Sequence, residues 1–162
     1  RDRMRLVLRF THYEDDDLIR LVARRCQALG WRVDADVLSG IAARSRGTPR
    51  LALRLLLACR RVARSNGDDH IVHRHFGRAC ELEQVDARGL DLTQQQYLRI
   101  LADAPTRLNV AASRLGLPAR TVAEVVEPFL IRTELVCKDE QGRRQLTTAG
   151  REHLTGRCQL PV

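Results

Sequence analysis

The sequence predicts a mainly α-helical chain with two small domains, the second of which ends in a β-hairpin. Apolar residues recur at helical spacing along most of the 162 residues, and the runs are separated by short turns rich in Gly, Asn and Asp. Only three Phe, two Tyr and one Trp are present, so the core must be built mainly from Leu, Val and Ala. After residue 85 the pattern changes from helices alone to helices followed by two short apolar strands.

Four helices are predicted in the first half, over residues 14–30, 34–47, 48–65 and 73–83, after a short strand at Leu6–Leu8. Acidic residues 14–17 open the first helix and Gly30 ends it, while Asp34 or Asp36 caps the second. Their apolar stripes are Leu18, Val22, Cys26 and Leu29; Val37, Leu38, Ile41 and Ala42; Leu51, Leu55, Leu56, Cys59 and Val62; and Phe76, Ala79, Cys80 and Leu82. Four short helices with short connections indicate a compact helical domain.

The second half follows a linker at residues 86–91. Helices are predicted over 93–102, 108–115 and 118–129, the last carrying Val122, Val125 and Val126. Short strands at 135–137 and 144–147 flank a polar turn at 138–143. Three helices followed by a hairpin with a charged tip are typical of the winged helix, a helix-turn-helix variant. The fold class is therefore a helical domain followed by a winged-helix domain.

The segment Arg44-Ser45-Arg46-Gly47-Thr48-Pro49-Arg50 is the best candidate for a ligand site. Thr48 suits a helix N-cap and Pro49 the first helical turn, which places Arg50 at the positive end of the third helix. A helix start that carries an arginine can hold an anion. The same residues also fit a capped, packed helix with an exposed arginine.

A net charge of +8 suggests a polyanionic partner, nucleic acid first. Lys138 is the only lysine, so 27 of the 28 basic residues are arginine. Residues 1–85 hold 17 basic and 11 acidic side chains, and residues 86–162 hold 11 and 9, so the winged-helix half is the less basic one.

Other classes of site find little support. The five cysteines are scattered without CxxC spacing, which favours reduced thiols over a disulfide frame or a zinc site. His70, His73 and His75 straddle a helix start and fit a solvated cluster better than a metal site. Glu124 and Glu127 share a helical face, but acid–base chemistry also needs a pocket and a substrate. No membrane span or secretory signal is visible, so the cytoplasm is the expected compartment.

Nearly the whole chain resembles the C-terminal portion of the RuvB family of Holliday-junction branch-migration helicases. The matching blocks, in order, are Arg1-Asp2-Arg3, Arg9-Phe10 with Tyr13, residues 44–50, Glu127-Pro128-Phe129-Leu130-Ile131, and Gly142-Arg143. The resemblance implies the tail of a missing AAA+ ATPase domain at 1–11, a helical AAA+ lid at 12–85, and a winged-helix DNA-binding domain at 92–158.

Site roles follow from the same resemblance. Arg50 resembles the lid arginine that senses nucleotide phosphates, Tyr13 lies where the family has a residue beside the base, and Arg3 matches a nucleotide-site arginine. Arg1 resembles the catalytic arginine that completes a neighbouring subunit's site. Lys138 and Arg143 fall at wing positions that contact DNA phosphates, and the adjacent Arg144 is expected to bind DNA with them.

The chain also departs from the family. Met4-Arg5 replaces Phe-Gly, the loop before Leu108 is shorter, and Asp139 and Glu140 weaken the phosphate-binding character of the wing. His75 and Glu83 stand where the family is usually apolar. These residues contain no GxxxxGK[ST] loop and no Walker B acid, so the chain alone is not expected to hydrolyse ATP.

The resemblance implies an ATP-dependent motor for DNA recombination and repair, with ATP and Mg²⁺ bound in the intact protein and none held by this chain alone. Its implied partners are four-way or duplex DNA without sequence preference, five further copies in a homo-hexamer, and RuvA, although the RuvA contact region is absent here. A stand-alone, sequence-specific DNA-binding or adaptor protein is a second interpretation, carried by Ser113, Arg114, Arg120 and Thr121. A subunit-contact domain is a third.

Overall fold

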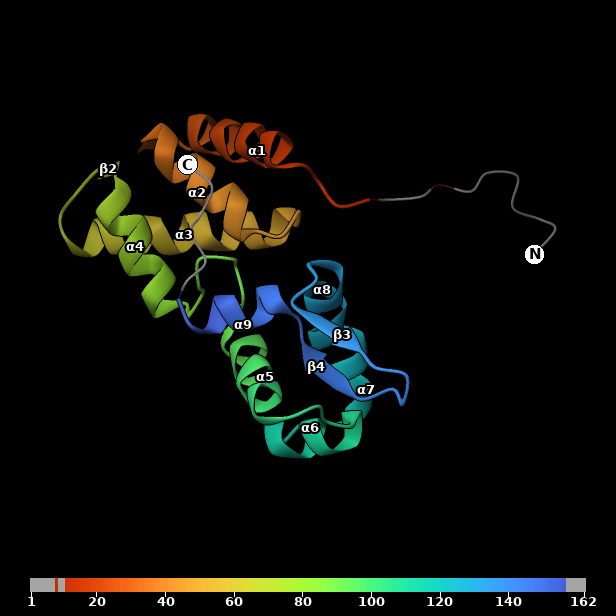
Figure 1. The fold of residues 1–162 in the computed structure, drawn as a ribbon. Coiled ribbons are helices and arrows are strands. Elements are labelled where there is room, and N and C mark those ends of the chain that lie inside the picture. The colour runs from red at the N-terminus through yellow and green to blue at the C-terminus, as the bar shows by residue number, and fades with distance from the viewer. Residues whose placement is uncertain (1–7, 9–10, 157–162) are drawn as a thin grey trace. The chain divides into compact units, whose positions relative to one another are not determined.

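The computed structural model describes residue 8 and residues 11–156, and the chain divides into two compact units after Gly89 (Figure 1). Each unit has its own apolar core, and the two are described separately. The mainly helical fold predicted from the sequence is confirmed. The strand predicted at Leu6–Leu8 lies outside the described residues except for Leu8, which is exposed and outside regular structure.

The N-terminal unit contains the four predicted helices, α1 (Asp15–Ala28), α2 (Ala35–Arg44), α3 (Pro49–Ser65) and α4 (His73–Leu82). Their apolar stripes meet in one core, in which Leu18, Ile41 and Leu56 are almost completely buried. Leu29 and Leu82 were expected in these stripes but are exposed, because each lies at or beyond the last helical turn, where the core no longer covers it.

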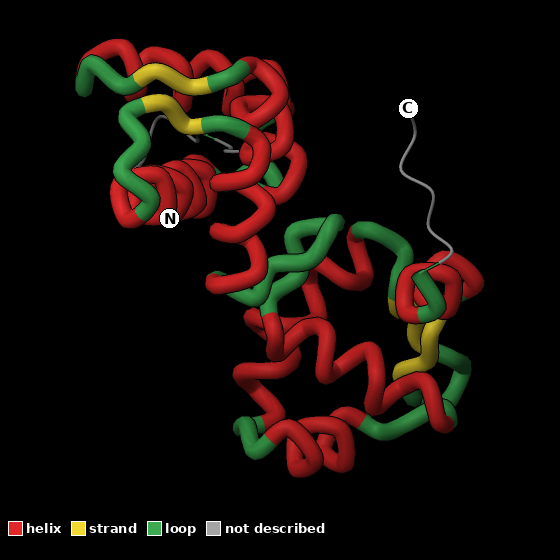
Figure 2. Tube along the Cα trace, turned by 90° about the vertical axis from the view of Figure 1, so that its left-hand side faces the viewer, coloured by secondary structure: helices red, strands yellow, loops and turns green. Residues whose placement is uncertain are grey.

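A two-stranded parallel sheet joins distant parts of this unit and was not predicted. Strand β1 (Arg32–Val33) pairs with β2 (His70–Ile71), with Arg32 opposite His70 and Val33 opposite Ile71. Figure 2 shows the two short strands side by side. Strands of two residues leave no readable period in a sequence, so only the packing of α1 to α4 brings them together.

The C-terminal unit follows the predicted winged-helix order. Helices α5 (Leu92–Asp103) and α6 (Leu108–Leu115) precede a third helical segment, and β3 (Val136–Lys138) pairs antiparallel with β4 (Arg144–Leu146). A bridge from Thr106 to Arg144 adds one more rung to the hairpin. A last helix, α9 (Thr148–Leu154), was not predicted; the Thr147 side chain caps it by accepting a hydrogen bond from the Gly150 amide.

The third helical segment is broken into α7 (Ala119–Thr121), the π-helix η1 (Val122–Val126) and α8 (Glu127–Arg132), and extends beyond the predicted end at residue 129. The Glu127 amide donates to the Val122 carbonyl, one residue further back than in an α-helix. Pro128 follows directly, and it has no amide hydrogen to continue an α-helical ladder. Val122 and Val126 are buried, but Val125 was expected with them and faces solvent, 68% exposed.

Candidate nucleotide and DNA sites

The start of α3 is held next to Tyr13 by the backbone. The Tyr13 amide donates a hydrogen bond to the Gly47 carbonyl, with nitrogen and oxygen 3.0 Å apart. Gly47 has φ of +70°, and a Cβ there would lie 2.6 Å from the Cβ of His12 and 2.9 Å from the Tyr13 carbonyl oxygen. Only glycine therefore allows this approach of the two segments. The structure thus brings the backbone of Tyr13 to Gly47, in the loop directly before α3 and Arg50.

Helix α3 begins as the sequence predicts, with Thr48 at the N-cap and Pro49 in the first turn. The Thr48 side chain, however, accepts no hydrogen bond from that turn. The first turn also contains no acidic residue, whereas Asp15, Asp16 and Asp17 all lie in the first turn of α1. The positive end of α3 is therefore left without a local negative charge.

Arg50 lies in this first turn and is exposed. Its side chain makes no hydrogen bond or ion pair with the part of the chain that the structure describes. Tyr13 is half exposed. The arrangement offers an anion a guanidinium and a helix start. Arg3, which was predicted for this site, lies outside the described residues. So does Arg1, which was predicted for the site of a neighbouring subunit.

The tip of the wing is organised by Asp139. One carboxylate oxygen, Oδ1, accepts hydrogen bonds from the amides of Gln141 (3.0 Å) and Arg143 (2.8 Å), and Oδ2 accepts from Arg143 Nε (2.7 Å). Partial burial alone would raise the pKa of Asp139, but the bonds from Arg143 and Gln141 outweigh it and hold the pKa below its usual value. The acid expected to weaken phosphate binding is therefore also the group that shapes the turn.

Three basic residues were predicted to contact DNA, and their surroundings differ. Lys138 is exposed and has no hydrogen-bond or ion-pair partner among the described residues. Arg143 is paired with Asp139, with its side chain 40% exposed. Arg144 is turned inward to the carboxylate of Glu127, with Nε and Oε1 2.7 Å apart, and its side chain is only 13% exposed.

Sequence reasoning missed the structural importance of Glu127. The residue is 2% exposed, and it is buried with Tyr97 and Arg144 instead of forming a carboxylate pair with Glu124. Glu124 is paired with Arg120 on the surface. Nothing in the sequence marks the link between Tyr97, Glu127 and Arg144, which come from α5, α8 and β4.

The residues of the second interpretation lie on α6 and α7. Arg114 contacts Asp103 at 3.1 Å and the Ile100 carbonyl at 3.4 Å, and Arg120 contacts Glu124 at 2.8 Å. Ser113 is exposed and Thr121 is partly buried. The two arginines that could read DNA bases are thus both paired with acids of their own domain.

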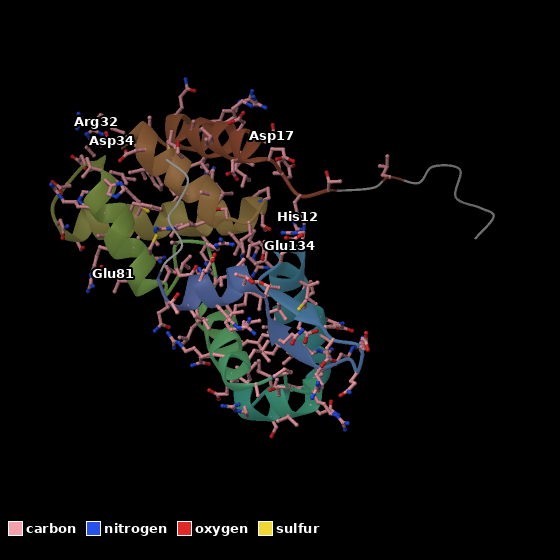
Figure 3. All side chains as sticks on the ribbon, viewed as in Figure 1. His12, Asp17, Arg32, Asp34, Glu81 and Glu134 are labelled. Atoms are coloured by element: carbon pink, nitrogen blue, oxygen red, sulfur yellow. The ribbon has the colours of Figure 1, made fainter. Side chains whose placement is uncertain are left out.

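The histidines at the sheet end of the N-terminal unit each face an aspartate. His70 pairs with Asp34 at 2.8 Å and lies opposite Arg32 in the parallel sheet. Figure 3 labels Arg32 and Asp34 at this end of the unit. His73 and His75 pair with Asp36 and Asp68, respectively, at 3.0 and 2.9 Å. Within residues 11–156, no group of three His, Cys, Asp or Glu side chains is placed to hold a metal ion.

The four cysteines among the described residues are all free thiols. Cys26, Cys59 and Cys80 are buried in the N-terminal core, and burial, with the neighbouring Cys80, raises the pKa of Cys59 to about 12. These thiols are therefore packing groups and not nucleophiles. Cys137 is partly buried and free. No helix in the described part of the chain has the length and apolar character needed to cross a membrane.

Two family models match the chain, and the boundary between them lies close to the boundary between the two compact units. Residues 13–86 match the model of the RuvB AAA lid domain, and residues 87–155 match the RuvB C-terminal winged helix domain. The chain belongs to the RuvB family. We therefore call its N-terminal unit the lid and its C-terminal unit the winged-helix domain.

Individual relatives agree with this assignment. The chain is 38% identical to "Holliday junction branch migration complex subunit RuvB 2" of Synechococcus sp. strain JA-3-3Ab, over its full length and 45% of the relative. It is also 38% identical to the RuvB subunit of Nocardia farcinica, over 95% of this chain and 44% of the relative. The Thermotoga maritima RuvB branch migration motor superposes with a TM-score of 0.85 at 28% identity, over 98% of this chain and 54% of that one. The chain thus spans about half the length of these relatives.

Proposed function

We propose that this chain serves as the nucleotide-sensing lid and DNA-contacting domain of an ATP-dependent motor that migrates Holliday junctions. The relatives are named as subunits of the branch migration complex, and the chain carries both C-terminal domains of that family. The observation that carries the proposal is the exposed Arg50 at the start of α3, whose side chain has no partner among the described residues. The loop before this helix start is bound to the backbone of Tyr13 through Gly47.

In the lid, Arg50 would contact the phosphates of ATP and Tyr13 would lie beside the base. An arginine without an internal partner loses no existing ion pair when it binds phosphate, and its charge adds to that of the helix start. Because Arg50 is fixed to α3, its approach to the phosphates is tied to the position of the whole lid. Arg3 would complete this site, and Arg1 would act catalytically in the site of a neighbouring subunit. The intact protein would supply the remaining ATP and Mg²⁺ ligands.

In the winged-helix domain, Lys138 and Arg143 would contact DNA phosphates. Such contacts hold a protein on DNA without reading its sequence, as a translocating motor requires. Lys138 is available as it stands. Arg143 is bound to Asp139 through Nε, so a phosphate would approach the other side of its guanidinium. The proposed partners are four-way or duplex DNA, further copies in a hexamer, and RuvA, with the cytoplasm as the compartment.

The DNA role is tested with a fluorescein-labelled four-way junction and anisotropy at 50 and 200 mM salt. With two phosphate contacts, we expect the affinity of the unaltered chain to fall about tenfold between these salt concentrations. Lys138→Glu with Arg143→Glu should abolish most of this salt-dependent binding.

The matched control is Arg24→Glu with Arg25→Glu, which changes the net charge equally on exposed residues of α1 in the lid. Equal losses in the control and in the wing variant would show that only net charge matters, and would overturn the DNA role of the wing. Protection of one defined sequence in a footprint would favour the sequence-specific adaptor instead.

A further inference from the structure

Arg144 uses three nitrogens to join two parts of the winged-helix domain. Its Nε and Nη2 donate to the two carboxylate oxygens of Glu127, at 2.7 and 3.3 Å. Its Nη1 donates to the carbonyl of Gly142 in the turn of the wing, at 2.8 Å. A single guanidinium therefore connects the tip of the hairpin to the first turn of α8.

The carboxylate of Glu127 also accepts a hydrogen bond from helix α5. The hydroxyl of Tyr97, which is completely buried on α5, donates to Glu127 Oε1 at 2.5 Å. The Glu127 carboxylate raises the pKa of Arg144, and burial followed by the same carboxylate raises the pKa of Tyr97. Tyr97 therefore keeps its proton and Arg144 its charge, and the buried carboxylate of Glu127 has hydrogen-bond donors from both α5 and β4.

Backbone hydrogen bonds also hold Arg144 in place. The amides and carbonyls of Thr106 and Arg144 exchange two hydrogen bonds, each 2.8 Å long. Across the hairpin, Arg144 is directly opposite Lys138 in the strand register. The position of Lys138 therefore depends on the residue that Glu127 holds in place.

We propose that Tyr97, Glu127 and Arg144 are positioning residues for DNA binding, which lock the wing against α8 so that Lys138 and Arg143 are presented in one arrangement. Arg144 thus acts from inside the domain and does not itself contact a phosphate. A wing that is already ordered loses less conformational freedom when it binds DNA. The inference rests on the DNA role proposed above.

The decisive variant replaces the whole network by apolar groups, Tyr97→Phe with Glu127→Met and Arg144→Met. It removes one acid and one base, so the net charge is unchanged. Replacement of a complete buried ion pair by apolar residues of similar size often preserves stability, whereas removal of one partner does not. Glu127→Gln alone is the comparison, because it leaves Arg144 without its counter-charge. The control is Arg78→Met with Glu81→Met, an exposed ion pair of the lid.

We expect the triple variant to unfold at nearly the same urea concentration as the unaltered chain. Its affinity for the labelled junction should nevertheless fall on the order of tenfold at 50 mM salt, as if one phosphate contact were lost. Lys138→Ala should weaken the unaltered chain but cause no further loss in the triple variant. Hydrogen exchange at the amides of Thr106 and Arg144 should become faster, while the amides of α6 keep their rates.

Two results would overturn the inference. The first is a triple variant that is as stable as the unaltered chain and also binds the junction as tightly. The network would then be purely structural. The second is an undiminished effect of Lys138→Ala in the triple variant. If the unaltered chain binds no junction at 50 mM salt, the proposed DNA role itself fails, and the exchange rates then report only how the wing is held.

Discussion

The helix start in the lid and the hairpin of the winged-helix domain both present arginines, and they hold them in opposite ways. Arg50 has no acidic neighbour in its helical turn and no partner in the described chain. Arg143 and Arg144 each have a carboxylate within 2.7 Å. An unpaired cation is ready for an external anion, whereas a paired one first serves its own domain. Arg50 is therefore available to an external anion, whereas Arg143 and Arg144 also hold parts of their own domain together.

Glu127→Gln should show the largest effect, because it leaves the guanidinium of Arg144 buried beside an uncharged partner. We expect the free energy of unfolding in urea to fall by about 3 kcal/mol. Glu124→Gln removes the exposed partner of Arg120 and should cost less than about 1 kcal/mol. Similar losses in both variants would mean that the Glu127 pair is no more important than a surface ion pair.

Arg50→Ala tests the role of the unpaired arginine in the lid. In a chimera that joins the N-terminal part of Thermotoga maritima RuvB to this chain, we expect ATP turnover to fall about 10- to 100-fold, the equivalent of one hydrogen bond to a charged group. The unfolding free energy of the chain itself should change by less than about 0.5 kcal/mol, because Arg50 is exposed and unpaired. Unchanged turnover would remove the sensing role, and Arg54→Ala, four residues along α3, is the control.

Asp139→Asn should make Arg143 resemble Arg50, because it removes the charged partner of Arg143. The asparagine oxygen can still accept amide hydrogen bonds in the turn, but the charge that holds Arg143 is gone. We expect tighter junction binding, because the guanidinium of Arg143 no longer has a competing carboxylate, and a slope of log affinity against log salt that changes by less than about one unit, because the number of phosphate contacts stays the same. Glu140→Gln removes an exposed acid next to it and serves as the control for charge alone. Weaker binding by Asp139→Asn would show that the ion pair is needed to present Arg143.

Lowering the pH should have the smallest effect on stability, and this effect should be similar in the two domains. The pKa of Asp68 in the lid is lowered by its hydrogen bond from Arg74, and then by His75, while the bonds from Arg143 and Gln141 lower the pKa of Asp139. A depressed carboxylate pKa gives stability that is fully present above the unfolded value of 3.8 and is lost as the pH falls through the folded value.

Carboxyl chemical shifts, followed by NMR from pH 6 to pH 2, should therefore show both groups titrating below pH 3.8. The Asp139→Asn variant should lose the acid sensitivity of the wing and keep that of the lid. A midpoint above 3.8 for Asp139 would contradict the ion pair with Arg143.

Much of the fold could be predicted because its signals are local. Helix α6 was predicted with its observed bounds, since Gly116 with positive φ ends it directly after the apolar run. The beginning of α3 was equally clear, because Pro49 fits only the first turn. The π-helix was not predicted, since it depends on how Pro128 is accommodated within a helix that is packed on two sides.

The sequence by itself determined the helices, the order of the two domains, the family, and the residues that carry charge at the two sites. Only the tertiary structure decided which of those charges remain available. Whether an arginine is free depends on carboxylates that are distant in the chain, as Glu127 is from Arg144. Burial then decides the outcome, because a charge removed from water must find its partner inside the fold, whereas an exposed one such as Lys138 need not.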